Sequence, residues 1–328
     1  MKPEEKDLGR EGRSLKPETE RAFANRVLLI RPQSFYSNPE TLGSNSFQGE
    51  QSSGVDLSLI HYEFDSLHER LEQLGIGVEL FESLKEAETP DAVFPNNWFS
   101  THSSGHLILY PMFAPSRRRE RREDIIQALQ RRHGPYQILD LSAYESRAWF
   151  LEGTGSLVLD RRSRTGFCSL SARSSEELVK IFEQETGYSI FCFESLTAEA
   201  RPVYHTNVMM SVGDTHALVC LDSISQPSQR KRLLEKLEEI GKSPLLIGLD
   251  QMESFCGNVL LLENGDAEKV WMASETAYRA FSKSQIQKLE SEADLQFVSI
   301  PWIERLGGGS LRCMMAEIFP CSESPSPF

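Results

Sequence analysis

Several features that would direct a protein to a membrane or to export are missing from this 328-residue chain. No apolar run reaches the length of a membrane-spanning helix. The start also lacks the basic segment, apolar run and small-residue cleavage site of a secretory signal. Its polar, charged beginning, MKPEEKDLGREGRSLKPETER, predicts a disordered extension over residues 1–22. We therefore expect a cytoplasmic protein with no membrane partner.

Positive charge is scarce, because 35 Lys and Arg stand against 48 Asp and Glu and leave a formal net charge of −13 at pH 7. Such a surface repels a phosphate backbone, so we expect no nucleic-acid partner. The basic cluster Arg117–Arg122 is interpreted as the solvated start of a helix. With 39% hydrophobic and 25% charged residues, the composition is otherwise that of a globular protein large enough to bury a sizeable core.

Paired cysteines are also absent. Six cysteines occur, but no two stand in a CxxC spacing, so the sequence does not support a zinc site. Cys321 begins the polar tail CSESPSPF, residues 321–328, which predicts an exposed thiol in a disordered segment. Four others lie in or beside apolar runs and predict small buried side chains in a reducing compartment: Cys168, Cys192, Cys220 and Cys256.

Two further patterns do not lead to a cofactor. His102 and His106 are spaced as metal ligands on a helix would be, but they flank a predicted hairpin turn, so we expect no metal there. The run GTG at residues 153–155 is too short for a dinucleotide-binding loop. We therefore expect neither a metal nor an organic cofactor.

What the sequence does contain is a hidden repeat. Helical periodicity recurs five times, and each helical candidate is followed by a short strand-like run. Four hairpin-like segments turn near residues 103–105, 164–166, 213–214 and 264–265. The predicted helices cover residues 56–74, 116–133, 174–187, 226–240 and 274–290, and the strands cover residues 78–82, 136–141, 188–194, 245–249 and 295–300.

A single residue marks the same position in each unit. Asn97, Glu152, His205 and Asn258 head the four hairpins, and Cys313 heads the last strand. The intervals between them are 55, 53, 53 and 55 residues, which unrelated residues would not be expected to match.

The fifth unit lacks its second strand, whereas the N-terminal run Arg26–Arg31 is a strand without a first half. We predict that this run completes the fifth unit and closes the chain into a ring. The result is one α/β domain over residues 23–320, with the five marked residues converging at its centre.

Three of these residues supply the groups of a thiol catalyst. A nucleophilic cysteine needs a base to form its thiolate and an acid to protonate a departing amine, and a histidine oriented by a carboxylate can do both. Cys313, His205 and Glu152 fit these roles. Taken alone, each is more typical of a core cysteine, a structural histidine or a turn glutamate, but their common register favours catalysis. Asn258 fits substrate contact and a structural role equally well.

The loop before Cys313, Gly307–Ser310, is rich in glycine, which allows a ligand to approach the backbone closely. Its N–H groups are candidates for stabilising a developing charge.

Six segments of the chain resemble the guanidino-group-modifying (pentein) superfamily, and most of all the citrulline hydrolases of citrulline utilisation. They are RPQSFYSNPET, PDAVFPNNWFSTH, FLEGTGSLVLDR, YHTNVMMSV, FCGNVLLLEN and GGGSLRCMMAEIFP, spread over residues 31–320. The second of them is the most specific. The resemblance implies a five-bladed α/β propeller, with Cys313 as nucleophile, His205 as general acid and base, and Glu152 as the carboxylate that orients it.

The same resemblance implies a set of substrate-binding residues. PDAVFPNNW is similar to the dimethylargininase stretch whose acidic residues hold a guanidinium; Asp91 is kept here, while Asn96 and Asn97 replace the later acidic pair. Arginine deiminases carry an Asp two residues after the catalytic His, where this chain has Asn207. APSRRRE and SLSARS resemble segments that bind an α-carboxylate, which points to Arg117 and Arg173.

These asparagines favour a neutral substrate. Carboxylates bind a cationic guanidinium through paired, charge-assisted hydrogen bonds, whereas an amide both donates and accepts. A ureido group likewise offers a C=O acceptor and N–H donors. N-succinylarginine dihydrolase resembles this pattern and takes a guanidine, although its second hydrolysis passes through a ureido stage.

We therefore expect a cysteine-dependent hydrolase that converts the small amino acid citrulline into ornithine, carbon dioxide and ammonia without a cofactor. Two other functions stay open. One is a deiminase, dimethylargininase or amidinotransferase acting on a guanidine; the other is a non-enzymatic binding propeller, since a related fold serves as a ribosome-binding factor. Assembly into a homo-oligomer stays open as well.

Overall fold

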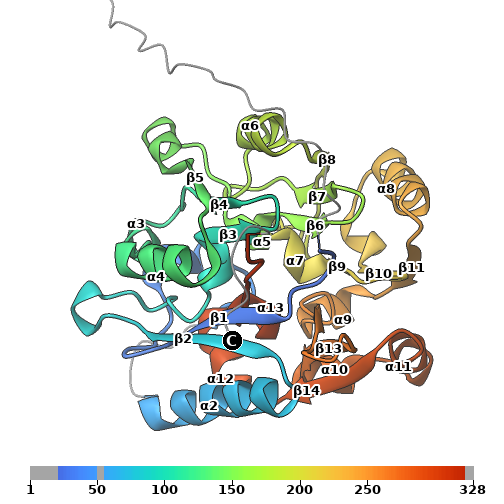
Figure 1. Ribbon diagram of the computed structural model, residues 1–328. Coiled ribbons are helices and arrows are strands. Elements are labelled where there is room, and N and C mark those ends of the chain that lie inside the picture. Colours follow the sequence, from blue (N-terminus) through green and yellow to red (C-terminus); the bar gives the residue numbers. More distant parts are fainter. Residues whose placement is uncertain (1–20, 50–54, 322–328) are drawn as a thin grey trace, which may run out of the picture.

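A computed structural model describes residues 21–49 and 55–321, so the expectations for the first 20 residues and for residues 322–328 lie outside the described part. Over this described part the fold is mixed α/β, with five three-stranded sheets arranged around a common centre (Figure 1). Across the described residues, no helix is both long and apolar enough to cross a membrane.

Four of the sheets are built alike from consecutive strands. The first strand pairs antiparallel with the second, and the second pairs parallel with the third, after the chain has passed through a helix. Their strands are β3 (Phe99–His102), β4 (His106–Leu109) and β5 (Gln137–Asp140); β6 (Val158–Asp160), β7 (Thr165–Ser169) and β8 (Ser189–Phe193); β9 (Met210–Val212), β10 (His216–Val219) and β11 (Ser243–Leu246); and β12 (Leu260–Glu263), β13 (Lys269–Ser274) and β14 (Asp294–Val298).

The fifth sheet joins the two ends of the domain. β1 (Arg26–Arg31) pairs antiparallel with β15 (Ala316–Glu317) and parallel with β2 (Gly77–Glu82). The predicted completion of the last unit by the N-terminal strand is therefore confirmed. Because this pairing joins residues almost 300 positions apart, it places the last unit beside the first.

Helices lie outside the sheets, one group to each unit (Figure 1). In α2 (Leu57–Gln73), Asp56 caps the first turn by accepting from the Ser58 N–H at 2.9 Å. Apolar residues at helical spacing, such as Phe64, face the sheet, and burying such a side chain stabilises the fold by about 1.5–3 kcal/mol. The other outer helices are α4 (Glu123–His133), α6 (Glu176–Thr186), α8 (Pro227–Glu239) and α11 (Lys283–Glu290).

Two predicted helices are each divided in two. Residues 116–133 form α3 (Pro115–Arg118) and α4, and residues 274–290 form α10 (Glu275–Ala280) and α11. The second division arises because Ser282 starts a new helix, its side chain accepting from the Gln285 N–H while Gln285 bonds back. Further short helices are α1 (Pro39–Leu42), α9 (Leu249–Glu253), α12 (Pro301–Gly307) and the 3-10 turns η1 (Lys85–Ala87), η3 (Ser142–Arg147) and η4 (Leu221–Ser223).

Single helical turns occupy the centre of the ring, where the sequence predicted the heads of strands. They are η2 (Pro95–Asn97), α5 (Gly153–Ser156), α7 (Thr206–Met209) and α13 (Leu311–Met314). The expectation that Cys313 heads the last strand is wrong, because this residue lies within α13 and β15 follows at Ala316. One helical turn is too short to show helical periodicity in the sequence.

The cysteines divide between core and periphery. Cys168, Cys220 and Cys256 are buried as expected, whereas Cys192 is half-buried. Cys321 is half-buried rather than exposed, because its backbone N–H donates to His133 O at 2.8 Å and its side chain packs against an apolar cluster.

Candidate active site

The marked residues Glu152 and His205 form a hydrogen-bonded pair at the centre of the ring. Glu152 directly precedes α5 and His205 directly precedes α7, and Oε2 of the glutamate lies 2.8 Å from Nε2 of the histidine. Oε1 accepts from the Phe113 N–H at 2.9 Å. Because an ionised carboxylate only accepts, Nε2 carries the proton and Nδ1 is the basic ring nitrogen.

Burial and nearby charges set the protonation of this pair. Burial opposes ionisation of Glu152, yet Arg173 at 3.6 Å, His205 and Arg117 at 4.0 Å lower its pKa to about 2. Burial lowers the pKa of His205 to about 4, against the opposing effect of Glu152. At neutral pH the carboxylate is therefore ionised and the imidazole is neutral, which is the form of a general base.

Cys313 lies on α13 with its sulfur between two side-chain amides. Nδ2 of Asn258 is 3.2 Å from Sγ, and Nδ2 of Asn207 is 3.4 Å from it. Asn258 also donates to the backbone carbonyl of Asn207 at 3.0 Å, which holds the two amides together. Two N–H groups directed at the sulfur stabilise a thiolate when the proton leaves. The sequence left Asn258 between substrate contact and a structural role; in the structure it contacts the sulfur of Cys313.

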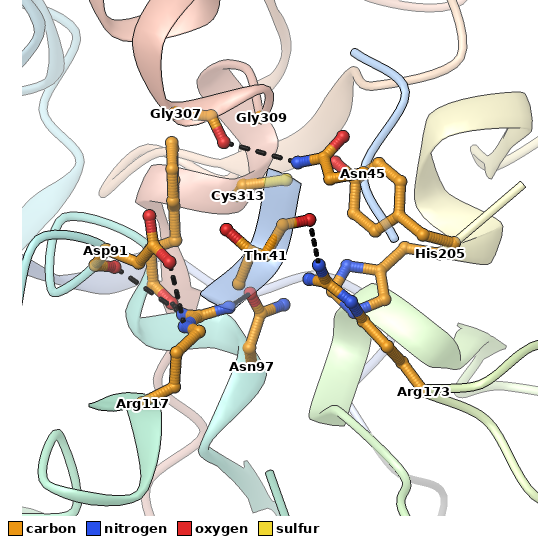
Figure 2. Close-up of a pocket in the computed structure, with 12 residues that line it drawn as sticks. Thr41, Asn45, Asp91, Asn97, Arg117, Arg173, His205, Gly307, Gly309 and Cys313 are labelled. Carbon is orange, nitrogen blue, oxygen red and sulfur yellow. Dashed lines mark hydrogen bonds and ion pairs between the residues drawn. The ribbon is translucent and has the colours of Figure 1, made fainter. Parts of the chain in front are cut away.

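A pocket with an empty volume of about 270 Å³ contains Cys313 and His205 together. Figure 2 shows their side chains facing this pocket, with Asn97 and Arg173 around it. Its lining consists of Thr41, Asn45, Asp91, Phe94, Asn97, Arg117, Arg173, Tyr204, His205, Gly307, Gly309 and Cys313.

The N-terminal segment around α1 forms one wall of this pocket. Asn45 donates from Nδ2 to the carbonyls of Gly307 and Gly308 at 3.3 and 3.2 Å, and Nη2 of Arg173 donates to Ser44 Oγ at 2.7 Å. Thr41 and Asn45 were not among the sequence candidates. They lie within or near the segment RPQSFYSNPET, but short polar side chains of this kind give no chemical signal.

Three predicted binding residues carry unpartnered polar atoms near Cys313: Asp91 and Asn97 line the pocket, and Asn207 lies beside the Cys313 sulfur. Nδ2 of Asn97, Oδ1 of Asn207 and Oδ1 of Asp91 are buried without a hydrogen-bond partner among the described residues. Oδ2 of Asp91 accepts from Asn38 at 2.7 Å, and burial raises the pKa of this carboxyl against the effect of Arg117. Asn96 points elsewhere, toward Thr154 Oγ1 at 3.3 Å, and does not line the pocket.

Both predicted arginines are buried, so the solvated helix start expected for Arg117–Arg122 is wrong at its first residue. Arg117 faces inward because Glu120, one turn later, accepts from its Nε and Nη2, each at 2.9 Å. Arg173 lies over the Tyr204 ring, with 5.0 Å between its guanidinium carbon and the ring centroid. Glu120 was missed in the sequence, although its spacing from Arg117 is that of an ion pair on a helical turn.

The GTG run at residues 153–155 belongs to α5, and the missing side chain of Gly155 leaves space for Asn97 and His205. A Cβ on Gly155 would lie 2.4 Å from Nδ2 of Asn97 and 2.7 Å from Nδ1 of His205.

His102 and His106 face each other across the β3–β4 hairpin, and Nε2 of His102 lies 3.0 Å from Ser100 Oγ. Within the described ranges, no three His, Cys, Asp or Glu side chains gather as metal ligands would.

Solved structures share this fold at low sequence identity. The N-terminal domain of ArgZ, an arginine dihydrolase from the ornithine-ammonia cycle in cyanobacteria, was solved as a mutant bound to substrate. It matches with a TM-score of 0.71 and 14% identity, over 90% of this chain and 98% of that domain. Full-length ArgZ matches with a TM-score of 0.72 and 14% identity, over 92% of this chain but 41% of its own length.

A third structure is a dimethylarginine dimethylaminohydrolase mutant in an adduct with S-methyl-L-thiocitrulline. It matches with a TM-score of 0.61 and 16% identity, over 90% of this chain and all of that one. At these identities the comparisons establish the fold.

The family comparison is more direct. No curated protein matches the chain. The family described as N,N dimethylarginine dimethylhydrolase, eukaryotic, matches residues 31–320, which include all five central landmarks. The chain therefore belongs to this family, within the guanidino-group-modifying superfamily of α/β proteins.

Proposed function

We propose that this protein is a cysteine-dependent hydrolase that cleaves the ureido C–N bonds of citrulline and yields ornithine, carbon dioxide and ammonia. One observation carries the choice of substrate: an unpartnered amide donor on Asn97 lines the pocket, and an unpartnered amide acceptor belongs to Asn207, whose Nδ2 lies 3.4 Å from the Cys313 sulfur.

This pair of groups complements a ureido group. The ureido oxygen accepts from Nδ2 of Asn97, and a ureido N–H donates to Oδ1 of Asn207, so neither amide atom stays buried without a partner. A guanidinium carries donors alone and would leave the Asn97 N–H groups unsatisfied. Arg173 also lines the pocket, and its unpartnered Nε–H is the donor that we assign to the α-carboxylate of the amino acid.

The reaction begins when Nδ1 of neutral His205 takes the Cys313 proton. The thiolate sulfur bonds to the ureido carbon, the C–N bond breaks, and the departing nitrogen takes the proton from His205. Glu152 stabilises the imidazolium through its 2.8 Å contact. Water then adds to the thiocarbamoyl carbon and gives its proton to His205, the S–C bond breaks and the thiol reforms. The carbamate that remains releases carbon dioxide and an amine.

A guanidine substrate is the second candidate, and Asp91 favours it. Its unpartnered carboxylate oxygen in the pocket is the type of group that binds a guanidinium. The family description names a dimethylarginine hydrolase, and ArgZ is an arginine dihydrolase. In this alternative Cys313 attacks the guanidinium carbon and citrulline accumulates.

The test incubates wild-type protein and its Cys313→Ser variant with citrulline, arginine and dimethylarginine, and follows ornithine, citrulline and ammonia. We expect ornithine from citrulline in the wild type and a loss of at least about 1000-fold in the variant, with unchanged thermal unfolding. Citrulline formed from a guanidine would replace the substrate assignment by the second candidate. Full activity in the variant would contradict thiol catalysis itself.

A further inference from the structure

The guanidinium of Arg117 has almost no N–H left for a substrate. Nε and Nη2 donate to the two carboxylate oxygens of Glu120 at 2.9 Å each, and Nη2 also donates to Phe94 O at 3.1 Å. Nη1 donates to Oδ1 of Asn97 at 2.7 Å. Of five N–H groups, one Nη1 hydrogen remains, and the Glu152 carboxylate already lies 4.0 Å from that nitrogen. Glu120 therefore occupies the Nε–Nη2 edge of the guanidinium, which could otherwise bind a substrate carboxylate.

The Nη1 contact decides which way the Asn97 amide faces. Arginine has no acceptor, so the atom 2.7 Å from Nη1 must be the amide oxygen. The NH₂ group of Asn97 then points to the other side, where it is buried without a partner among the described residues. Gly155 leaves the room for this, since a Cβ there would stand 2.4 Å from Nδ2.

Glu120 is the group that keeps Arg117 in this position. Its side chain is fully buried and its two oxygens take two parallel N–H groups, an arrangement that fixes a guanidinium in its plane. The competing carboxylates stand farther off, Asp91 Oδ2 at 3.8 Å and Glu152 Oε2 at 4.0 Å. Without Glu120, Arg117 would be drawn to these two, and Asn97 would be free to turn its oxygen into the pocket.

We propose that Glu120 and Arg117 are a positioning pair that holds the Asn97 amide as a hydrogen-bond donor and so selects a substrate with an acceptor oxygen over a guanidine. The α-carboxylate role that the resemblance implied for Arg117 then falls to Arg173 alone. This inference rests on the proposed function and names the residues behind its choice of substrate.

Measurements of ligand binding distinguish the positioning role of Glu120 from the effect of its negative charge. In a Cys313→Ala background, which binds without turnover, we would measure Kd for citrulline and arginine by calorimetry with and without Glu120→Gln. A glutamine can accept from only one Arg117 N–H and directs its own NH₂ at the other. We expect the preference for citrulline to fall about tenfold, the value of one hydrogen bond. Loss of a negative charge by itself would weaken arginine binding and shift the preference the opposite way.

Two further variants complete the test. Glu120→Asp keeps the charge and both oxygens on a shorter arm, so it should restore part of the preference, and it carries the test if Glu120→Gln does not fold. Glu79→Gln, a buried and ion-paired carboxylate outside the pocket, should leave the preference unchanged.

The outcomes distinguish the two proposals. A preference that is unchanged, or shifted toward citrulline, in folded Glu120 variants overturns the positioning role, while citrulline turnover by the wild type still supports the function. A Cys313→Ala protein that binds arginine but not citrulline overturns the donor role of Asn97, and an absence of ornithine from citrulline in the wild type then shows that the function has failed too.

Discussion

Two buried Glu–His pairs in this protein share one contact and differ in their surroundings. At the centre of the ring, Nε2 of His205 lies 2.8 Å from Glu152, and between β2 and α4, Nε2 of His133 lies 2.8 Å from Glu79. Each pair joins residues about one repeat unit apart in the sequence, 53 and 54 positions respectively.

The two carboxylates have similar electrostatic surroundings. Burial opposes ionisation of Glu79, but hydrogen bonds from His133 and Arg132 hold its pKa below the ordinary value, as His205 and the arginines do for Glu152. What differs is the space beside the histidine. His205 lines the pocket that contains Cys313, whereas neither Glu79 nor His133 is among the residues that line it. An oriented histidine becomes a candidate catalyst through the nucleophile and cavity next to it.

Replacing the two histidines should separate the pairs most strongly. His205→Gln removes the base for Cys313, so we expect kcat to fall by roughly 1000-fold or more with the fold retained. His133→Gln should keep kcat within about twofold and lower the free energy of unfolding by about 1–3 kcal/mol, because Glu79 loses a buried partner. Citrulline turnover and urea unfolding measure both, and equal losses of activity would show that the comparison is mistaken.

Replacing the two carboxylates, Glu152 and Glu79, should produce the next largest difference in effect on activity. Glu152→Gln leaves the shape of the site but removes the charge that stabilises the His205 imidazolium, so we expect kcat to fall by roughly 100-fold while KM changes little. Glu79→Gln should reduce stability and leave both kinetic constants near wild type. A large rise in KM for Glu152→Gln would instead place this carboxylate on the substrate.

A smaller effect is expected from crowding the central pair. In Gly155→Ala the new Cβ meets both Asn97 and His205, so one of these side chains must shift and kcat/KM should fall by about tenfold or more. Overpacking should also lower the free energy of unfolding by about 1–3 kcal/mol. Gly248→Ala is the matched control, because nothing lies within 4 Å of its added Cβ. Steady-state kinetics of both variants would decide, and unchanged kcat/KM in Gly155→Ala would mean that the site has more room than the structure allows.

The Glu152–His205 pair should also make the free energy of unfolding depend on pH in the acidic range. The pKa of His205 is about 4 in the fold and ordinarily 6.5, so the unfolded chain binds more protons between these values and stability falls as pH drops from 6.5 to 4. Glu152, at about 2 against 4.5, extends the loss below pH 4.5. His205→Gln should remove up to about 3 kcal/mol of the loss between pH 6.5 and 4. Urea unfolding across this range, with Cys313→Ser as control, measures it; identical slopes in both variants would exclude His205 as the source.

The repeat could be predicted from the sequence because its outer helices have a regular spacing of apolar residues. Outer helices such as α2, predicted at 56–74 and found at Leu57–Gln73, carry apolar residues every three or four positions over several turns. The spacing of the landmarks led to the five units and to closure by Arg26–Arg31. The helical turns at the centre were not predicted, because α13 and α7 have four residues each and are too short to show helical periodicity.

The sequence was least informative about which charges are buried. Arg117 and Arg122 stand in one basic run, yet the first is buried and the second bonds to Asp124 at the surface. Composition treats them alike. The difference arises because α3 turns Arg117 toward Glu120 and Asn97, while Arg122 precedes α4 at its exposed start.

The sequence by itself determined the α/β class, the five units, the ring closure and the three candidate catalytic residues, because these follow from local periodicity and equal spacing. Tertiary structure alone decided the orientation of Asn97, the burial of Arg117 with Glu120, and the wall that Asn45 builds against Gly307 and Gly308. Asn45 and Gly308 are 263 positions apart, and a hydrogen bond over that separation depends on where the folded chain places each donor and acceptor.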